Sequence, residues 1–413
     1  MKLLIHDYGG YGFTVQLGRQ LARRGHEVCY LYGDSTQLVK RGAFARQPSD
    51  PPNLAIQGIS LSQPFQKYSL IRRRAQEIEY GRCLAEKIVA QRPDVVISGN
   101  TPLDTQAIAL DSARACGARF VFWLQDLIGL ATYKILTKKH KLLGHTIGRY
   151  YMGLERLLLR RSDGVILIAE DFRPIVEKLD VRPGRITTLS NWAPLDELPR
   201  HPRQNPWAQA HGLSTCFTFL YSGVLALKHN PDLLLQLALH WKTRDHVKIV
   251  VVSQGPGADW LRQKCAENSL DNLLVLDFHS HDQFPHVLAS ADVLLTLLEA
   301  DAGVFSVPSK VLTYLCAGRP LLLAVPPENL AARIVCQHAA GLVVSPGDLT
   351  GWITASETLY ADQELRRKFA ARAVQYADQH FDIQRITDRF EEILYLGKEE
   401  TIALSLGSIA VQK

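Results

Sequence analysis

The sequence lacks the features that mark several large classes of protein. Its seven cysteines are odd in number, lie scattered between Cys29 and Cys336, and include no Cys-x-x-Cys pair, so neither a disulfide framework nor a metal site is expected. Buried thiols in a reducing cytoplasm are the simpler interpretation. No stretch is long and apolar enough to cross a bilayer. The opening residues, MKLLIHDYGG, have the pattern of a strand and a turn rather than of a secretory signal.

Charge is too evenly balanced for a typical nucleic-acid-binding protein. Among the 413 residues, 46% are hydrophobic and 21% are charged, as in ordinary folded soluble proteins, and the net charge is +6 at pH 7. This mild positive excess suits small anionic ligands or an anionic membrane surface. The length predicts two or three domains.

Apolar runs alternate with helical patterns along the chain, which predicts an α/β fold with parallel sheets covered on both faces. The expected strands are 2–7, 26–32, 93–100, 118–126, 163–172 and 185–192 in the first half, and 217–223, 248–257, 273–278, 291–298 and 320–325 in the second. Prolines at 194, 199, 202 and 206 interrupt this alternation. We therefore expect a first domain over 1–195, a linker over 196–213 and a second domain over 214–375.

A glycine-rich turn follows the first expected strand. Gly9, Gly10 and Gly12 allow a ligand to approach the backbone, and the start of the next helix offers N–H groups to an anion. The turn departs from the full dinucleotide fingerprint because Val15 takes its last position, although Asp34 stands at a suitable distance for a ribose contact. A plain strand-to-helix turn is the alternative interpretation.

Three turns of the second half are candidates for phosphate binding. Gly223 follows a strand and Lys228 precedes a helix cap, which suits a diphosphate, although such a lysine taken alone is usually a solvated loop residue. Gly255 lies in a second glycine-rich turn, where the turn alone can explain the glycine. In VFSVPSKVLTYLCAGRP, Lys310 stands at an expected helix start. A cation is unfavourable there unless an anion binds beside it.

Gln125 and Asp126 stand at the carboxyl end of an expected strand, which is the edge where ligands bind in open α/β sheets. Asp126 can orient or deprotonate a hydroxyl at such an edge. It can equally cap the following helix. The local sequence leaves both interpretations open.

Residues 133–161 carry eight lysines and arginines against a single acid, Glu155, with leucine, isoleucine and tyrosine interleaved. We expect Lys138, Lys139, Lys141 and Arg149 to face an anionic membrane or the acceptor, because acidic partners are nearly absent. A solvated helix face whose apolar side enters the core is the alternative.

These motifs occur in the order found in the family 4 glycosyltransferases of the GT-B fold, which the chain resembles over nearly its whole length. FPHVLASADVLL (284–295) and the segment ending in AGRP are part of this resemblance, and PSKVLTYLCAGRP is most similar to the branch that builds bacterial surface polysaccharides, including colanic-acid and fucosamine-type transferases. The resemblance implies two Rossmann-like domains that face a cleft, with the acceptor mostly on the first and a nucleotide sugar on the second. It also implies that a helix over 376–398 returns to the first domain, which leaves a tail over 399–413.

The resemblance further implies a set of donor-binding residues. They are Gly9, Gly10, Gly12, Gly223, Lys228, Gly255, Phe278, His279, Ser309, Lys310, Val311 and Thr313. Within this set, backbone around Phe278 and His279 would meet the base, and residues 309–311 would lie beside the diphosphate and ribose. Asp126, Lys228 and Lys310 are the implied catalytic residues, with Asp126 near the position where many relatives place a His-Asp pair against the donor sugar.

One departure from the family pattern concerns acidic residues. Many members carry two glutamates separated by seven residues, one for the transferred sugar and one for the ribose. The matching positions here are Phe305 and Thr313, and neither is acidic. Glu299 and Asp301 lie a few residues upstream and are the possible substitutes.

The expected reaction moves a sugar from a nucleotide-diphosphate sugar to a hydroxyl of a lipid-linked or oligosaccharide acceptor, in exopolysaccharide or lipopolysaccharide synthesis. The family implies retention at the anomeric carbon. Lysines and helix N-termini can stabilise the leaving diphosphate without a metal, so no cofactor is expected. The expected location is the inner face of the cytoplasmic membrane, with no nucleic-acid partner. The alternatives are a nucleotide-sugar 2-epimerase of the same fold, an NAD-linked dehydrogenase, and a non-catalytic sugar-nucleotide-binding relative.

Overall fold

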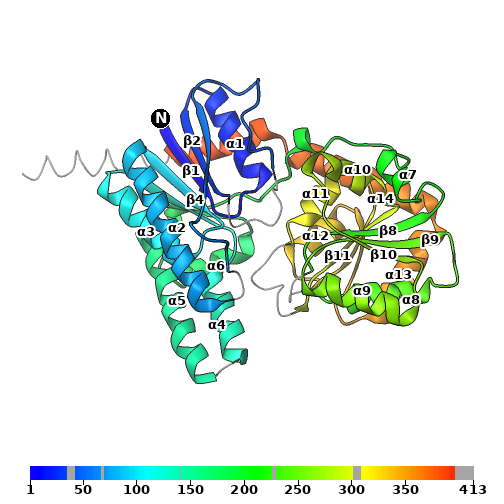
Figure 1. The fold of residues 1–413 in the computed structure, drawn as a ribbon. Coiled ribbons are helices and arrows are strands. Elements are labelled where there is room, and N and C mark those ends of the chain that lie inside the picture. The colour runs from blue at the N-terminus through cyan, green and yellow to red at the C-terminus, as the bar shows by residue number, and fades with distance from the viewer. Residues whose placement is uncertain (35–41, 67–68, 140, 226–228, 301–307, 396–413) are drawn as a thin grey trace, which may run out of the picture. The chain divides into compact units, whose positions relative to one another are not determined.

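The computed structural model describes residues 1–34, 42–66, 69–139, 141–225, 229–300 and 308–395. The chain forms two compact α/β units (Figure 1). The first unit contains Met1–Asn191 and the C-terminal segment from Ile383, and the second contains Trp192–Asp382.

The first unit is built on a seven-stranded parallel sheet with the order β3-β2-β1-β4-β5-β6-β7. Its strands are β1 (Lys2–Asp7), β2 (Glu27–Gly33), β3 (Leu54–Ile59), β4 (Val95–Gly99), β5 (Arg119–Leu124), β6 (Gly164–Leu167) and β7 (Ile186–Thr188). Because β1 pairs with β2 on one side and β4 on the other, the strand order reverses between β1 and β4. Open α/β sheets bind ligands at such a switch point, beyond the carboxyl ends of the strands.

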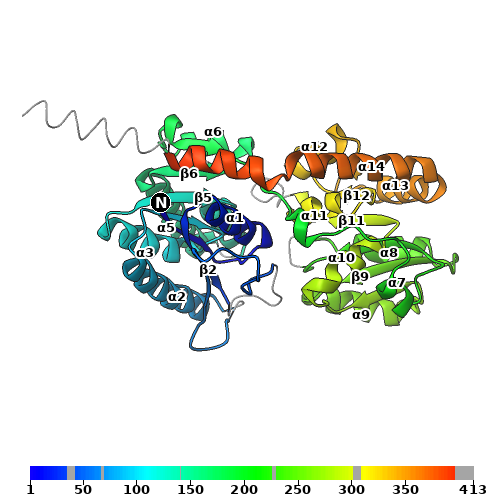
Figure 2. The same ribbon diagram turned by 90° about the horizontal axis from the view of Figure 1, so that it is seen from above.

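Helices cover both faces of this first sheet (Figures 1 and 2). They are α1 (Gly12–Arg23), α2 (Leu70–Gln91), α3 (Leu103–Ala115), α4 (Ile128–Lys139), α5 (Lys141–Arg161) and α6 (Arg173–Glu177). A further helix over 383–395 lies beside α1 (Figure 2). Its fully buried Phe390 packs edge-on against Trp123 with 5.2 Å between ring centroids. Arg24, next to α1, donates to the carboxylates of Asp388 and Glu391 at 2.6 and 2.7 Å.

The second unit is built on a six-stranded parallel sheet with the order β10-β9-β8-β11-β12-β13, which reverses between β8 and β11. Its strands are β8 (Phe217–Ser222), β9 (Val247–Val252), β10 (Leu273–Leu276), β11 (Val293–Leu297), β12 (Leu321–Ala324) and β13 (Gly341–Val344). Its helices are α7 (Pro206–Ala210), α8 (Asp232–His240), α9 (Pro256–Asn268), α10 (Phe284–Ala289), α11 (Lys310–Cys316), α12 (Leu330–Gln337), α13 (Leu349–Ala361) and α14 (Gln363–His380). Trp352 in α13 is fully buried, and its indole N–H donates to the Leu233 carbonyl at 3.1 Å, which holds α13 against the start of α8.

The organisation differs from the sequence prediction in two places. The region expected to be a linker, 196–213, belongs to the second unit and contains α7, whose Trp207 is buried. The helix expected over 376–398 is two helices, because α14 ends at His380 and the next helix begins at residue 383. The chain passes from the second unit back to the first at this break. The tail over 399–413 lies outside the described residues.

Candidate functional site

The switch point of the first sheet is organised by Asp7, the last residue of β1. Its buried carboxylate accepts the backbone N–H groups of Gly9 and Tyr11 at 3.0 and 2.7 Å, the Thr14 hydroxyl at 2.6 Å, and the Asn100 amide at 3.0 Å. Burial raises the pKa of Asp7, whereas these four hydrogen bonds lower it. A carboxylate offers about four acceptor positions, and these four hydrogen bonds, two of them from the glycine turn, use about that number.

The backbone N–H groups of the glycine turn itself bond to Asp7. The Gly10 N–H bonds to the Asp7 carbonyl at 3.1 Å, so the amides of residues 9, 10 and 11 all donate to Asp7. Gly10 has φ of +57°, which favours glycine. Gly12 starts α1 and is buried, and a side chain at Gly42 would come within 2.6 Å of its Cα. The amides of residues 9–11 are therefore used within the protein, and the role expected for Gly9, Gly10 and Gly12 in donor binding stays a prediction.

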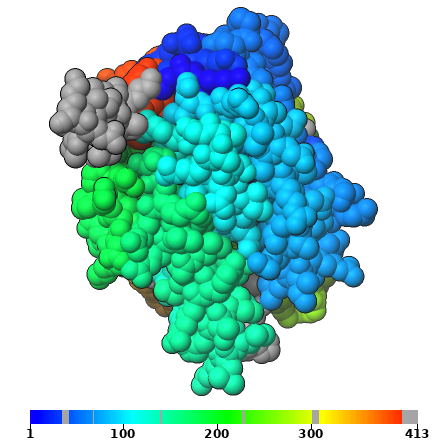
Figure 3. Space-filling model, turned by 90° about the vertical axis from the view of Figure 1, so that its left-hand side faces the viewer, coloured from blue at the N-terminus to red at the C-terminus, as the bar shows by residue number. Residues whose placement is uncertain are grey.

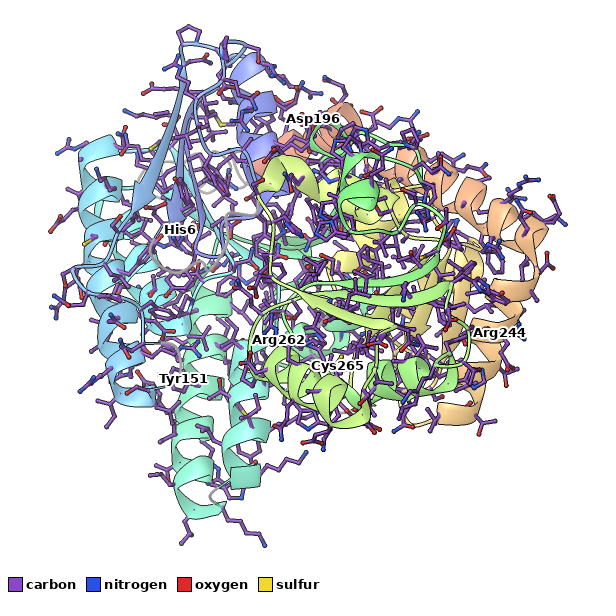
Figure 4. The ribbon with its side chains drawn as sticks, turned by 45° about the vertical axis from the view of Figure 1, so that its right-hand side comes forward. His6, Tyr151, Asp196, Arg244, Arg262 and Cys265 are labelled. Carbon is purple, nitrogen blue, oxygen red and sulfur yellow. The ribbon has the colours of Figure 1, made fainter. Side chains whose placement is uncertain are left out.

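A buried polar network lies behind this turn. His6 on β1 (Figure 4) hydrogen-bonds to the hydroxyls of Ser98 and Tyr80 at 2.9 and 3.0 Å. The Ser98 hydroxyl donates in turn to Gln106 at 2.6 Å. Burial lowers the pKa of His6 to about 3, so its imidazole is neutral near pH 7. The network fixes β1 and β4 against α2 and α3.

Gln125 and Asp126 follow β5 at the same carboxyl edge, but their environments differ. Gln125 is buried and forms a reciprocal amide pair with Asn191, at 2.6 and 3.3 Å. Asp126 is exposed, and its carbonyl accepts the N–H of Ile128 at 3.0 Å. Asp126 is thus exposed at the carboxyl edge of the first sheet, the edge where open α/β sheets bind ligands.

In the second unit, the switch point is where β8 and β11 separate. Their pairing runs through Leu220 and stops there, although β8 continues to Ser222. At Ser222 the buried Tyr314 hydroxyl of α11 replaces β11 as the hydrogen-bonding partner of β8. It accepts the Ser222 N–H at 2.8 Å and donates to the Ser222 carbonyl at 3.0 Å. This tyrosine fixes the start of α11 beside the end of β8.

Lys310 and Gly223, which are far apart in the sequence, meet at this point. The Lys310 ammonium lies 3.7 Å from the centroid of the Tyr221 ring, a cation–π contact. Gly223 has φ of +142°, and a Cβ there would lie 2.8 Å from the Lys310 Nζ. The Tyr221 hydroxyl donates to the Val224 carbonyl at 3.3 Å, which fixes the ring. A lysine is thereby held at the carboxyl edge of the second sheet, the edge where open α/β sheets bind ligands.

The turn after β9 packs against the turn after β8. Gly255 has φ of +102°, and a Cβ at Gly257 would lie 2.7 Å from the Cβ of Leu225. The Leu225 N–H donates to the Ser253 hydroxyl at 3.1 Å. These glycines thus permit a backbone approach that supports the Gly223 turn.

The other predicted donor residues have mixed positions. Ser309 is exposed at the start of α11, Val311 is buried, and the Thr313 hydroxyl bonds back to the Lys310 carbonyl at 2.8 Å. The amide of Val311 is used within the turn, since it donates to the Pro308 carbonyl at 3.1 Å. Lys228, Asp301 and Phe305 lie outside the described residues.

Phe278 and His279 follow β10, which is the edge strand and is separated from β8 by β9. The His279 ring packs edge-on against Trp207 and His211, with centroids 5.4 and 5.6 Å apart. Burial and the neighbouring His211 lower the pKa of His279. The structure thus places Phe278 and His279 two strands away from β8, the strand beside which Lys310 lies.

The basic segment forms a hairpin of α4 and α5, which projects from the first unit in Figure 3. Its glycines allow the two helices to touch, since a Cβ at Gly144 would lie 2.4 Å from the Leu136 carbonyl carbon. Lys138, Lys141 and Arg149 are exposed, while the Lys139 side chain lies outside the described part. Within that part, no helix is long and apolar enough to cross a membrane, and no group of three or more histidine, cysteine or acidic residues is arranged to hold a metal.

Comparison with protein families identifies the chain. The model described as a glycosyl transferase 4-like domain matches residues 9–192, and the model described as glycosyl transferases group 1 matches residues 204–376. The chain belongs to the family 4 glycosyltransferases of the GT-B fold. The predicted family, fold and enzyme class are confirmed, and the narrower surface-polysaccharide branch stays a prediction.

Individual relatives agree with this assignment. The glycosyltransferase is 24% identical over 396 residues to N-acetyl-alpha-D-glucosaminyl L-malate synthase of Bacillus anthracis, with 94% of each chain covered. Its fold matches Anabaena HepE in complex with UDP and glucose (TM-score 0.70, 15% identity, 95% of this chain and 99% of that chain). It also matches WaaG, a glycosyltransferase involved in lipopolysaccharide biosynthesis (TM-score 0.66, 17% identity, 95% and 99%).

Sequence reasoning missed several residues of the glycosyltransferase that shape these edges. Asp7 was assigned only to a strand, and Tyr221 and Tyr314 were part of apolar runs. Tyrosines within apolar patterns usually belong to the core, so only the position of Tyr221 at the end of a strand before Gly223 was a usable signal. The hydrogen bonds of Tyr314 to Ser222 join residues 92 apart, which no local pattern reveals.

Proposed function

We propose that this glycosyltransferase moves a sugar from a nucleotide-diphosphate sugar to a hydroxyl of a lipid-linked or oligosaccharide acceptor, in bacterial surface-polysaccharide synthesis. The transfer proceeds with retention and without a metal, at the inner face of the cytoplasmic membrane. The observation that carries the proposal is the Lys310 ammonium, held by Tyr221 and Gly223 at the switch point of the second sheet.

Lys310 stabilises the leaving group in this proposal. Breaking the bond between the sugar and the diphosphate leaves negative charge on the phosphate oxygens, and a fixed cation stabilises that charge more in the transition state than in the ground state. The contact with the Tyr221 ring keeps the ammonium in place before the donor binds. The fold is shared with HepE, which binds UDP, and this supports a uridine nucleotide as the first donor to test.

Asp126 orients the acceptor hydroxyl or the transferred sugar. It is exposed at the carboxyl edge of the first sheet, and a carboxylate at that edge can accept a proton or a hydrogen bond from a hydroxyl. A retaining glycosidase uses two carboxylates about 5 Å apart. Retention here relies instead on front-face attack, which the family resemblance suggests, with Asp126 as a single positioned carboxylate.

The hairpin of α4 and α5 supplies the membrane contact. Its tip (Ile135, Lys138, Lys141, Leu142 and Leu143) combines basic side chains with exposed apolar ones, and Leu142 is 88% exposed. Apolar residues enter the headgroup region and lysines bind anionic lipids, with about 1 kcal/mol for each basic residue near the surface. A membrane contact explains an exposed leucine pair that the fold itself does not use.

A transfer assay tests the donor role. We expect Lys310→Ala to lower turnover by about 10²-fold or more, as loss of a charge contact in the transition state does. Lys264→Ala is the control, because Lys264 is a lysine of the same unit that pairs with Glu267 on α9. Near-normal turnover of a folded Lys310→Ala protein contradicts the assignment.

Co-sedimentation with liposomes containing phosphatidylserine tests the membrane role. We expect the triple change of residues 138, 139 and 141 from lysine to glutamate to weaken binding while the unfolding temperature stays close to that of the wild type. A control with the same change of charge uses exposed lysines elsewhere: Lys178, Lys242 and Lys368. Equal binding by the two triple variants contradicts a specific role for the hairpin tip.

A small hydroxy acid is the second candidate acceptor. The relative with 24% identity carries the name of an enzyme that makes N-acetyl-alpha-D-glucosaminyl L-malate. Adding L-malate in place of a lipid-linked acceptor in the same assay separates the two. Product formed with malate alone, without lipid, favours the second candidate.

A further inference from the structure

Glu155, the single acid of the basic hairpin, is buried within it. The residue lies in α5 and is 3% exposed. Its carboxylate accepts the N–H of Gly129 at 3.0 Å, and the N–H groups of Ile128 and Leu130 face it closely enough to lower its pKa. These are the first three residues of α4. The carboxylate of one helix therefore caps the N-terminus of the other, where a negative charge is favoured.

Gly129 makes this cap possible. A Cβ at this position would lie 2.8 Å from the second carboxylate oxygen of Glu155 and 2.9 Å from the carbonyl oxygen of Tyr151 (labelled in Figure 4). The first turn of α4 thus touches α5 at a point where only glycine fits without displacement. The position of the α4 start is consequently set by Glu155 and by the backbone of α5.

The same turn presents Asp126. Asp126 precedes α4 by two residues, and the Ile128 N–H that faces Glu155 also bonds to the Asp126 carbonyl at 3.0 Å. The two side chains also act on each other electrostatically. Burial raises the pKa of Glu155 to about 7, the three N–H groups lower it, and the charge of Asp126 raises it further.

We infer that Glu155 is a positioning residue for Asp126. By fixing the first turn of α4, it fixes the backbone that carries the Asp126 carboxylate at the carboxyl edge of the first sheet. The inference rests on the proposed role of Asp126 in transfer. A shift of about 1 Å in a catalytic group can lower turnover by about 10²-fold, so a buried residue that never touches substrate has a measurable kinetic effect.

Two substitutions separate the position of the carboxylate from its charge. Glu155→Gln removes the charge but keeps an oxygen for the Gly129 N–H. Gly129→Ala keeps the charge but displaces the carboxylate. Glu155→Leu removes the carboxylate altogether, and Gly129→Ala takes its place in the test if the Glu155→Leu protein fails to fold. Glu86→Gln, at an exposed glutamate of α2, is the control.

We expect Glu155→Leu and Gly129→Ala to lower kcat by about 10-fold or more, with KM for the donor sugar within about threefold of the wild type. Glu155→Gln restores kcat to within about threefold. In a protein that already carries Asp126→Asn, the Glu155→Leu change has little further effect, because two residues that act through one contact are not additive.

The outcomes distinguish this inference from the proposed function. If Asp126→Asn alone leaves turnover normal, the proposed role of Asp126 fails. If Asp126→Asn lowers turnover while folded Glu155→Leu and Gly129→Ala proteins keep the wild-type kcat, the positioning role of Glu155 is overturned. Equal losses from Glu155→Leu with and without Asp126→Asn also overturn it, since they indicate a general structural effect.

Discussion

Replacement of Gly223 by alanine is expected to weaken nucleotide binding with only a modest loss of stability. The added Cβ lies 2.8 Å from the Lys310 Nζ and 3.0 Å from its Cε. Because those atoms end a flexible side chain, the lysine moves and the backbone stays. The remaining cost is the strain of alanine at φ of +142°, about 1–3 kcal/mol. In a unit of this size each kcal/mol lowers the unfolding temperature by about 2–4 °C.

The effect on binding follows from the displaced ammonium. A hydrogen bond to a charged group contributes about 1.5–3 kcal/mol, which corresponds to about 10- to 150-fold in Kd. Isothermal titration with UDP, or with whichever nucleoside diphosphate binds the wild type, measures this loss. Gly212→Ala is the matched control, because Gly212 has φ of +67° and no described atom lies within 4 Å of its added methyl. Wild-type affinity in Gly223→Ala would refute the reasoning.

Three further predictions concern stability. Tyr314→Phe removes both hydrogen bonds to Ser222 and is expected to lower the free energy of unfolding by about 1–3 kcal/mol, measured by urea denaturation. Burial raises the pKa of Glu155 to about 7 from an ordinary 4.5, more than the N–H groups of α4 lower it, so the folded protein favours the neutral acid; the resulting stabilisation is fully present below pH 4.5 and is lost as pH rises through 7. The raised pKa corresponds to about 3 kcal/mol of unfolding free energy. The unfolding temperature of Glu155→Gln relative to that of the wild type should therefore be higher at pH 7.5 than at pH 5. An equal difference between the two proteins at both pH values contradicts this prediction. Arg24→Ala removes an ion pair with Glu391 that is one-fifth exposed on each side and should increase proteolysis of the C-terminal helix.

The sequence predicted the strands that are buried and strongly apolar. The prediction of residues 2–7 agrees with β1, and the run 217–223 agrees with β8 to one residue. The edge strands β3 and β13 were missed. The segment LAIQGI of β3 carries glutamine and glycine and is partly exposed, and GLVV of β13 has four residues. The other two edge strands, β7 and β10, were predicted, so the weak apolar pattern of β3 and the short one of β13, rather than the edge position alone, explain why local sequence missed them.

The break at residues 381–382 was missed for a different reason. The amphipathic pattern continues from α14 into the helix over 383–395 without glycine or proline, the usual stop signals. α14 ends where the chain leaves the second unit, because the next helix belongs to the first unit. This is a tertiary effect. Local sequence carries helix propensity, but it does not show which sheet a helix packs against.

The candidate site was predictable residue by residue but not as an arrangement. Gly223 and Lys310 were both assigned to phosphate binding, yet the sequence did not indicate that the missing side chain of one makes room for the other. The glycine turn near Gly9 was assigned to close approach of a ligand, but the sequence did not indicate that the amides of residues 9–11 donate to Asp7. Glu155 stood out only as the exception in a basic segment, and its burial came from packing of α4 on α5.

Donor binding at Lys310 is tested most directly by a thermal-shift screen of the wild type and Lys310→Ala with UDP, GDP, dTDP and ADP sugars. A ligand that binds only the folded protein raises the unfolding temperature, and the rise grows with the logarithm of its concentration divided by its Kd. We expect at least one nucleotide sugar to stabilise the wild type by several degrees and to have little effect on Lys310→Ala. If none stabilises the wild type, or if the same sugar stabilises both proteins equally, Lys310 is not the donor site.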